Sequence, residues 1–432
     1  MDTRALINEL HHPGWREILL AQLDETTDAY HRHVALYEPL RKAEEVGRLK
    51  SELAPDAHDC ELLVRIGLIG AFPSAKPWQD VGQQLLSWFW TLRHASFAHV
   101  TRQHFDAASD GSRAYALVIL ACQETPEATE LLITLVKQHG LPQRTPPRFF
   151  WEINKRHTAV ANRLFPELLL RAGDELASVM NYLNASLEAG QLTAETLRPT
   201  ASWVESEAAR LLDIVQPRQR AEGTKWRADE DYAESRSNLG VHLDLLGIVP
   251  GSRLVALERA AQLNDPLLVL FAVVSMLKRG IEPQVPALLA CAKSHETRAA
   301  LHKQLKHLGR LDLFPSEFLT FEAFAAAAMT EWLLYPAELG YEPTSLEFIA
   351  EVEGTKDGEP VVMCLWKFTT DEGEALAAAS GPYPASRPVE PLWGQDTFSR
   401  FTAWDKLTPE GHLEGILETL DNWKIAYCEG RM

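Results

Sequence analysis

Two stretches of the sequence decide the fold: AYALVILACQETPEATELLITLVKQHG at residues 114–140 and LLVLFAVVSMLKRGIEPQVPALLACAKSH at residues 267–295. Each begins with a very apolar segment, continues through a short polar break that contains a proline (Pro126 or Pro283), and ends with a segment that carries a Leu-Leu pair. Apolar residues recur at three- and four-residue spacing, which predicts α-helices. The similarity of the two stretches indicates a degenerate helical-hairpin repeat, in which each apolar helix is buried by its neighbours.

Helical patterning of this kind runs from about residue 58 to residue 335, interrupted at short intervals by proline and glycine. Helices of roughly ten to twenty residues between tight stops are typical of stacked helical hairpins. We therefore predict a mainly α fold, an α-solenoid of HEAT/armadillo-like hairpins over residues 58–335, with a non-repetitive all-α domain as the alternative. The amphipathic residues 1–57 are expected to form an N-terminal helical cap, and the polar residues 216–237 to interrupt the array.

The pattern changes after residue 335. Three short apolar-rich runs are separated by polar turns, at residues 346–353, 360–370 and 374–380. Connections this short predict a three-stranded antiparallel meander. A closing helix over residues 409–427, with Thr408 as its N-cap, completes a small C-terminal α+β module at residues 336–432.

The sequence of this module is specific enough to suggest a family. The segments MTEWLLYPAELGYEPTSLEFI (329–349), LWKFTT (365–370), SGPYP (380–384) and TFSRFTAW (397–404) resemble a C-terminal module of bacterial HEAT-repeat-like proteins of unknown function. The resemblance covers about 100 residues. It implies a helical-repeat fold and a bacterial source, and it supplies no catalytic residues.

Composition narrows the classes of function. The 432 residues are 46% hydrophobic and 24% charged, as in an ordinary globular protein, and the formal net charge is −18. Such a charge repels nucleic-acid phosphates and anionic lipids, so a general nucleic-acid or membrane-surface binder is not expected. Residues 338–432 carry 18 acids and 7 bases, a net of −11, which makes the C-terminal module a suitable surface for a basic partner.

Cysteines and termini indicate a cytoplasmic protein. The five cysteines are scattered and form no CxxC pair, which argues against a disulfide framework or a zinc ribbon. The N-terminal MDTRALINELHH has no apolar core of a signal peptide. The longest apolar run, Leu267 to Leu277, is too short to span a bilayer.

Catalytic signatures are absent from the sequence. It contains no G-x-x-x-x-G-K-[ST], no H-E-x-x-H and no G-x-S-x-G. His31 and His33 lie on different faces of a helix, and His94, His99 and His104 drift around one, so neither group predicts a metal site. We therefore expect neither cofactor nor metal, and no enzymatic activity.

A basic stripe is a candidate binding surface. Arg298, His302, Lys306 and Arg310 follow i, i+4, i+8, i+12 spacing and would line one face of a helix. The stripe is interpreted in one of three ways: a solvated outer face, a contact for an acidic partner, or a contact with the protein's own acidic C-terminal module.

Aromatic residues of the module offer a second candidate. Tyr383 and Trp393 stand in a Pro-rich segment, where an exposed aromatic side chain would serve as an interface anchor. Packing against the sheet is the alternative for both residues.

These observations favour a non-catalytic protein-interaction protein. It would bind a protein partner, which is expected to be basic, as an immunity or antitoxin-like inhibitor of a bacterial toxin or as an adaptor. The alternative is an enzyme on a helical-repeat scaffold, either a lyase or a DNA glycosylase-like protein. A glycosylase would need a basic groove, which the net charge opposes.

Overall fold

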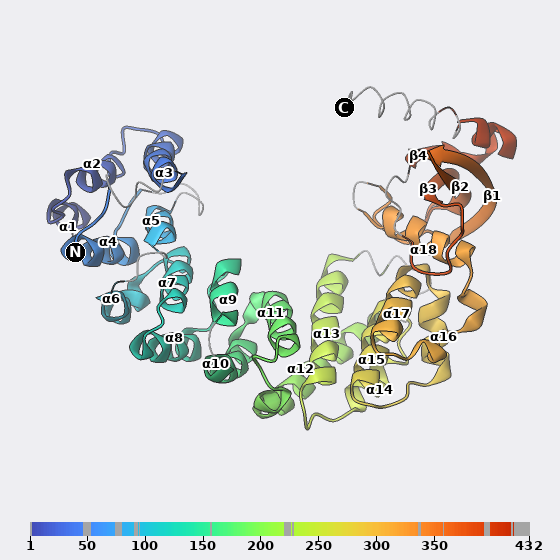
Figure 1. The fold of residues 1–432 in the computed structure, drawn as a ribbon, viewed down its shortest axis with the longest axis horizontal. Coiled ribbons are helices and arrows are strands. Elements are labelled where there is room, and N and C mark those ends of the chain that lie inside the picture. Colours follow the sequence, from blue (N-terminus) through green and yellow to red (C-terminus); the bar gives the residue numbers. More distant parts are fainter. Residues whose placement is uncertain are drawn as a thin grey trace. The chain divides into compact units, whose positions relative to one another are not determined.

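The computed structural model describes residues 2–45, 53–73, 80–89, 94, 96–155, 158–219, 226, 229–335, 338–356, 358–392, 398–415 and 418. The chain divides into two compact units, residues 1–200 and residues 201–432. Both are rich in helices, and the second also holds a β-sheet (Figure 1). The predicted mainly α fold is confirmed.

Helices of the first unit contact one another in two rows. One row is α5, α7, α9 and α11, and the other is α4, α6, α8 and α10 (Figure 1). The helices of this unit are α1 (Thr3–Asn8), α2 (Pro13–Ala21), α3 (Ala29–Glu45), α4 (Ala57–Ile69), α5 (Val81–Phe89), α6 (Ser96–His104), α7 (Asp110–Cys122), α8 (Pro126–His139), α9 (Pro147–Asn154), α10 (Thr158–Arg171) and α11 (Leu176–Glu188).

The stretch at residues 114–140 forms the hairpin of α7 and α8. Ser109 caps α7 by accepting the N–H of Ser112, and Thr125 caps α8, whose first residue is Pro126. Gly140 ends α8 with φ of +74°, a conformation that glycine adopts at no steric cost. Every residue of α7 from 116 to 122 is buried, because helices on several sides surround it.

Helices of the second unit repeat this neighbour-to-neighbour contact. α13 contacts α12 and α15, and α17 contacts α15, α16 and α18. The stretch at residues 267–295 supplies α15 and α16. The helices are α12 (Ala201–Arg218), α13 (Glu230–Ile248), α14 (Val255–Ala260), α15 (Pro266–Lys278), α16 (Val285–Lys293), α17 (His295–His307) and α18 (Phe321–Leu333).

Short 3₁₀ helices connect several of these elements. They are Phe105–Ala107, Gly173–Glu175, Ala194–Thr200, Leu311–Leu313, Ser316–Phe318 and Trp404–Lys406.

A buried polar network joins three helices of the second unit. Asp265, which is 0% exposed, caps α15 and accepts hydrogen bonds from the Tyr232 hydroxyl at 2.8 Å and from Arg236 Nε at 2.7 Å. Arg236 on α13 also reaches Glu296 in the first turn of α17 at 2.8 Å. Each buried charge therefore has a partner, without which its burial would cost several kcal/mol.

The sheet of the C-terminal module has four antiparallel strands in the order β1-β2-β3-β4. The prediction of three strands is therefore wrong. The fourth strand, β4, pairs with β3 after a long connection, so the short turns that revealed the first three strands do not reveal it. The strands are β1 (Ser345–Lys356), β2 (Glu359–Thr369), β3 (Ala375–Pro384) and β4 (Phe398–Ala403).

Helix α18 packs against this sheet and contacts β1 and β3 (Figure 1). Trp366 on β2 is 1% exposed, and its Nε1–H donates to Ser380 Oγ on β3 at 2.7 Å. Phe321 of α18 meets the Tyr383 ring edge-on, with centroids 5.8 Å apart. Aromatic packing of this kind is the core between helix and sheet.

The predicted closing helix is found where the structure describes it. Residues 409–415 are helical, and Thr408 caps them by accepting the N–H of Gly411 at 3.2 Å. Apart from Glu418, which is also helical, the remainder of the prediction to residue 427 lies outside the described residues. Among the described helices, none is both long and apolar enough to cross a membrane.

The Asp265 network yields a first prediction. Asp265→Ala leaves the Arg236 guanidinium and the Tyr232 hydroxyl without their buried acceptor, so the free energy of unfolding should fall by about 3 kcal/mol or more. Urea denaturation followed by circular dichroism measures the change. The control is Asp213→Ala, which removes an ion pair with Arg259 whose carboxylate is 69% exposed and should cost less than about 1 kcal/mol. Equal losses would contradict the structural role of the network.

Candidate functional site

Helix α17 does not present the basic stripe on one exposed face. Arg298 and His302 are buried, at 3% and 6% exposure, whereas Lys306 is exposed. Residues four apart turn by about 40° around a helix of 3.6 residues per turn, so a stripe of four drifts by about 120°. The helix ends at His307, so Arg310 lies beyond it. The prediction of a continuous basic surface is therefore wrong.

Arg298 links three helices. Its guanidinium donates to the carbonyl of Ala292 at 2.7 Å, of Lys293 at 2.9 Å and of Ala323 at 2.5 Å. The first two carbonyls end α16 and the third lies in α18. Burial lowers the pKa of Arg298 to about 10, which still leaves the side chain charged at pH 7. Its contacts are structural, so it is not available to an outside partner.

His302 lies between two aromatic rings. It meets Phe314 and Phe324 edge-on, with centroids 5.3 Å and 5.1 Å away. Burial and the nearby Lys306 lower its pKa, so the ring is neutral at pH 7. Among the described residues, no group hydrogen-bonds to its Nδ1. The side chain is part of the core beneath α18.

The two remaining members of the stripe face acidic groups of the same unit. Lys306 Nζ lies 3.8 Å from Glu390 of the C-terminal module, with both side chains more than half exposed. Arg310 pairs with Glu282 at 3.2 Å and with Asp312 at 3.3 Å. Exposed pairs of this kind contribute little to stability. Of the four residues, Lys306 is thus the one that forms an ion pair with the module at its exposed surface.

Tyr383 is not an exposed anchor. It is 1% exposed, because β3 presents its ring to α18, and burial raises the pKa of its hydroxyl. Tyr383 instead packs between the sheet and α18, in line with the alternative interpretation. Trp393 lies outside the described residues.

Exposed carboxylates are the feature that the C-terminal module does present to solvent. Glu351 and Glu353 on β1 are both paired with Arg387. In the part of residues 338–418 whose side chains the structure describes, Lys406 is the one exposed base. The exposed acids are Glu347, Glu351, Glu353, Glu359, Glu372, Glu374, Glu390, Asp405, Glu410, Glu414 and Glu418.

Four of the module's acids gather at one end of the sheet. Glu347 lies on β1, opposite Lys367 in the register of β2, and Asp371, Glu372 and Glu374 belong to the turn that joins β2 to β3. The start of β1 pairs with the end of β2, at Ser345 and Thr369, so the strand and the turn are neighbours. We call these four residues the acidic sheet end.

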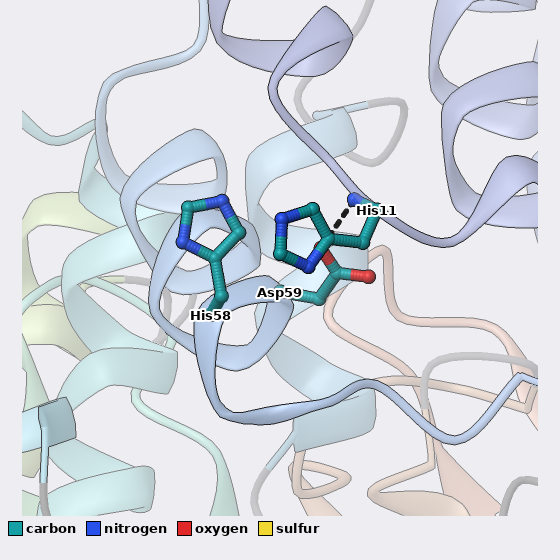
Figure 2. A group of neighbouring side chains, drawn as sticks. All are labelled: His11, His58 and Asp59. Carbon is teal, nitrogen blue, oxygen red and sulfur yellow. Dashed lines mark hydrogen bonds between the residues drawn. The ribbon is translucent and has the colours of Figure 1, made fainter.

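A different cluster occurs near the N-terminus. His11 lies in the loop before α2, and His58 and Asp59 lie in the first turn of α4 (Figure 2). One ligand atom from each of the three side chains lies within 4.8 Å of the others. Both histidines are exposed, and Asp59 is buried at 1% exposure. The set could hold a metal ion.

Hydrogen bonds hold each member of this cluster. The Asp59 carboxylate accepts the backbone N–H of His11 at 2.7 Å and of His12 at 2.9 Å. His11 Nδ1 is 2.9 Å from an Asp56 carboxylate oxygen, and this contact together with the N–H of Asp59 lowers the pKa of Asp56. His58 Nε2 is 3.2 Å from a backbone carbonyl, that of Glu9.

Comparison with known proteins adds no assignment: the chain matches no known family model, no curated protein and no solved structure.

The sequence did not predict the His11–His58–Asp59 cluster because His11 lies 47 residues before His58. The pairs weighed from the sequence, such as His31 with His33, were neighbours along one helix. The contact arises only when α1 packs on α4 and the loop between α1 and α2 bonds to Asp59 at the start of α4. The signal in the sequence was the adjacent pair His58 and Asp59, which follows the N-cap Asp56 in the first turn of α4.

His295, the first residue of α17, yields a second prediction. Burial and the neighbouring Arg298 lower the pKa of His295 to about 4. Between that value and the ordinary value near 6.5, the unfolded chain binds a proton that the folded chain does not. His295 therefore reduces stability as the pH falls from about 7 to 4. In His295→Gln, whose amide oxygen keeps an acceptor for Arg298, this part of the loss should disappear.

Urea denaturation at pH 7.0 and pH 4.5 measures this effect. The control is His307→Gln, which changes an exposed histidine at the end of the same helix and should leave the pH dependence as in the parent. An unchanged difference between the two pH values in His295→Gln would show that His295 titrates normally.

Proposed function

We propose that the protein is a non-catalytic binding protein whose C-terminal module engages a basic protein partner. The observation that carries this proposal is the charge of the module surface, where many carboxylates and one exposed base are described. An anionic surface of this kind speeds encounter with a basic protein and suppresses acidic competitors. An inhibitor of the immunity or antitoxin type, or an adaptor, would use it in this way.

The helical part of the proposal is a HEAT/armadillo-like solenoid. It is supported within each unit by contacts between every second helix, such as α5, α7, α9 and α11 in the first and α13, α15 and α17 in the second. Helices that contact mainly their neighbours form an extended surface, which suits binding of a protein.

The acidic sheet end is the part of the module that we assign to the partner. At the other end of β1, Arg387 already neutralises Glu351 and Glu353. Of the acidic sheet end, Glu372 and Glu374 are exposed and stand in a turn, where a partner reaches them without displacing a strand. Their charges are therefore available to a basic surface.

Charge reversal tests the proposal. The full chain, immobilised through a tag, is incubated with extract of the native host, and eluted proteins are quantified by mass spectrometry. We expect one polypeptide of basic isoelectric point in stoichiometric amount, released by salt because the contact is electrostatic. Glu347→Lys, Glu372→Lys and Glu374→Lys combined should reduce its recovery at least about tenfold, since each reversed charge at a contact costs of order 1 kcal/mol.

The matched control reverses three exposed glutamates of the first unit, Glu17, Glu25 and Glu188, and gives the same change in net charge. Retention of the partner by this control, with loss by the module variant, supports the proposed surface. Equal recovery by both variants contradicts it, as does a partner that is acidic.

A further inference from the structure

The N-terminal cluster has a donor set suited to a metal ion. His11 and His58 supply imidazole nitrogens, and Asp59 supplies a carboxylate oxygen, with ligand atoms within 4.8 Å of one another. The three side chains come from two segments, the loop before α2 and the first turn of α4, which the packing of α1 on α4 and the hydrogen bonds to Asp59 bring together (Figure 2). Three donors that leave a coordination position open are typical of solvent-accessible Zn²⁺ sites.

The partners of these side chains favour ligation. In metal sites, a histidine that ligates through one nitrogen commonly donates its other N–H to an oxygen, which fixes the ring and raises its basicity. His11 Nδ1 has such an oxygen in Asp56 at 2.9 Å, and this leaves its Nε2 for a metal. His58 Nε2 lies 3.2 Å from the Glu9 carbonyl, which is a longer contact.

Asp59 is the fixed point of the cluster. Each of its carboxylate oxygens accepts one backbone N–H, from His11 and from His12. A carboxylate oxygen has two lone-pair sites, so each retains one for a further partner. The same two bonds tie the loop that carries His11 to α4. The position of His11 therefore depends on Asp59.

The imidazole rings are stacked, with centroids 4.3 Å apart and planes 22° from parallel. Because an imidazole nitrogen binds a metal in the plane of its ring, the two lone pairs converge on one ion only after one ring rotates. A metal would be reached by turning His58, which gives up its contact with Glu9, because at 3.2 Å that contact is longer than the 2.9 Å contact of His11 with Asp56. The side chain of His58 is exposed, so the movement disrupts the stacking with His11 but opens no buried core.

We propose that His11, His58 and Asp59 form a binding site for a divalent transition-metal ion of the Zn²⁺ class. Two imidazole nitrogens and one carboxylate select such ions over Mg²⁺ and Ca²⁺, which prefer sites made of oxygen. Solvent completes the coordination, because the side chain of His11 is 62% exposed. This site lies in the first unit and does not depend on the function proposed for the C-terminal module.

Metal titration of the full, untagged chain tests the site. Zn²⁺ competition with a chromophoric chelator measures stoichiometry and affinity, and Co²⁺ absorption in the visible range reports the donor set. We expect one ion per chain. His11→Ala and His58→Ala should each weaken Zn²⁺ binding by at least about tenfold and should remove the Co²⁺ bands.

The control is His99→Ala, which removes an exposed histidine on α6 of the same unit and should leave binding as in the parent. Both ligand variants change exposed side chains, and circular dichroism verifies that each remains folded. Asp59→Asn, which keeps one acceptor for the backbone, should also weaken binding. The proposal is overturned if the parent binds no Zn²⁺ at micromolar concentrations, or if the two histidine variants bind it as the parent does.

Discussion

Burial of apolar helices by their neighbours is the constraint on which this structure depends. α7 is buried along residues 116–122, and Leu268, Ala272 and Val273 of α15 are 0% exposed. Neither helix has a polar face to turn toward water, so each needs helices on several sides. Burying apolar surface is worth about 25 cal/mol per Å², and for such helices this term far exceeds intrinsic helix propensity. The rows of helices in each unit follow from that requirement.

Polar groups then fix which helix meets which. Asp265 serves both as the N-cap of α15 and as the acceptor for Arg236 of α13, so one side chain sets the start of a helix and its neighbour. Asp59 has a related part in the first unit, where it joins α4 to the loop before α2. Apolar packing alone tolerates sliding between helices, whereas hydrogen bonds of defined length do not.

The sequence predicted what depends on local patterning. The helices at residues 114–140 and 267–295, the first three strands and the Thr408 cap were all recognisable from spacing and turn residues. β4 was missed because its partner edge on β3 lies far back along the chain. The prediction that the basic stripe lies on one exposed face was wrong for a geometric reason, because residues four apart drift around a helix. In addition, α18 covers Arg298 and His302. The histidine cluster was missed because it requires the packing of α1 on α4, which no local pattern reveals.

Helix α18 belongs to both parts of the second unit, and this affects how the chain can be divided. Its first turn supplies the Ala323 carbonyl to Arg298, and its Phe321 ring packs on Tyr383 of the sheet. A truncation before α18 would expose the Arg298 guanidinium and the aromatic surface around His302. A truncation after it would expose the face of α18 that covers the sheet. The boundary between the helical array and the C-terminal module is therefore a shared helix. A truncation on either side of α18 exposes surface that is buried in the intact chain.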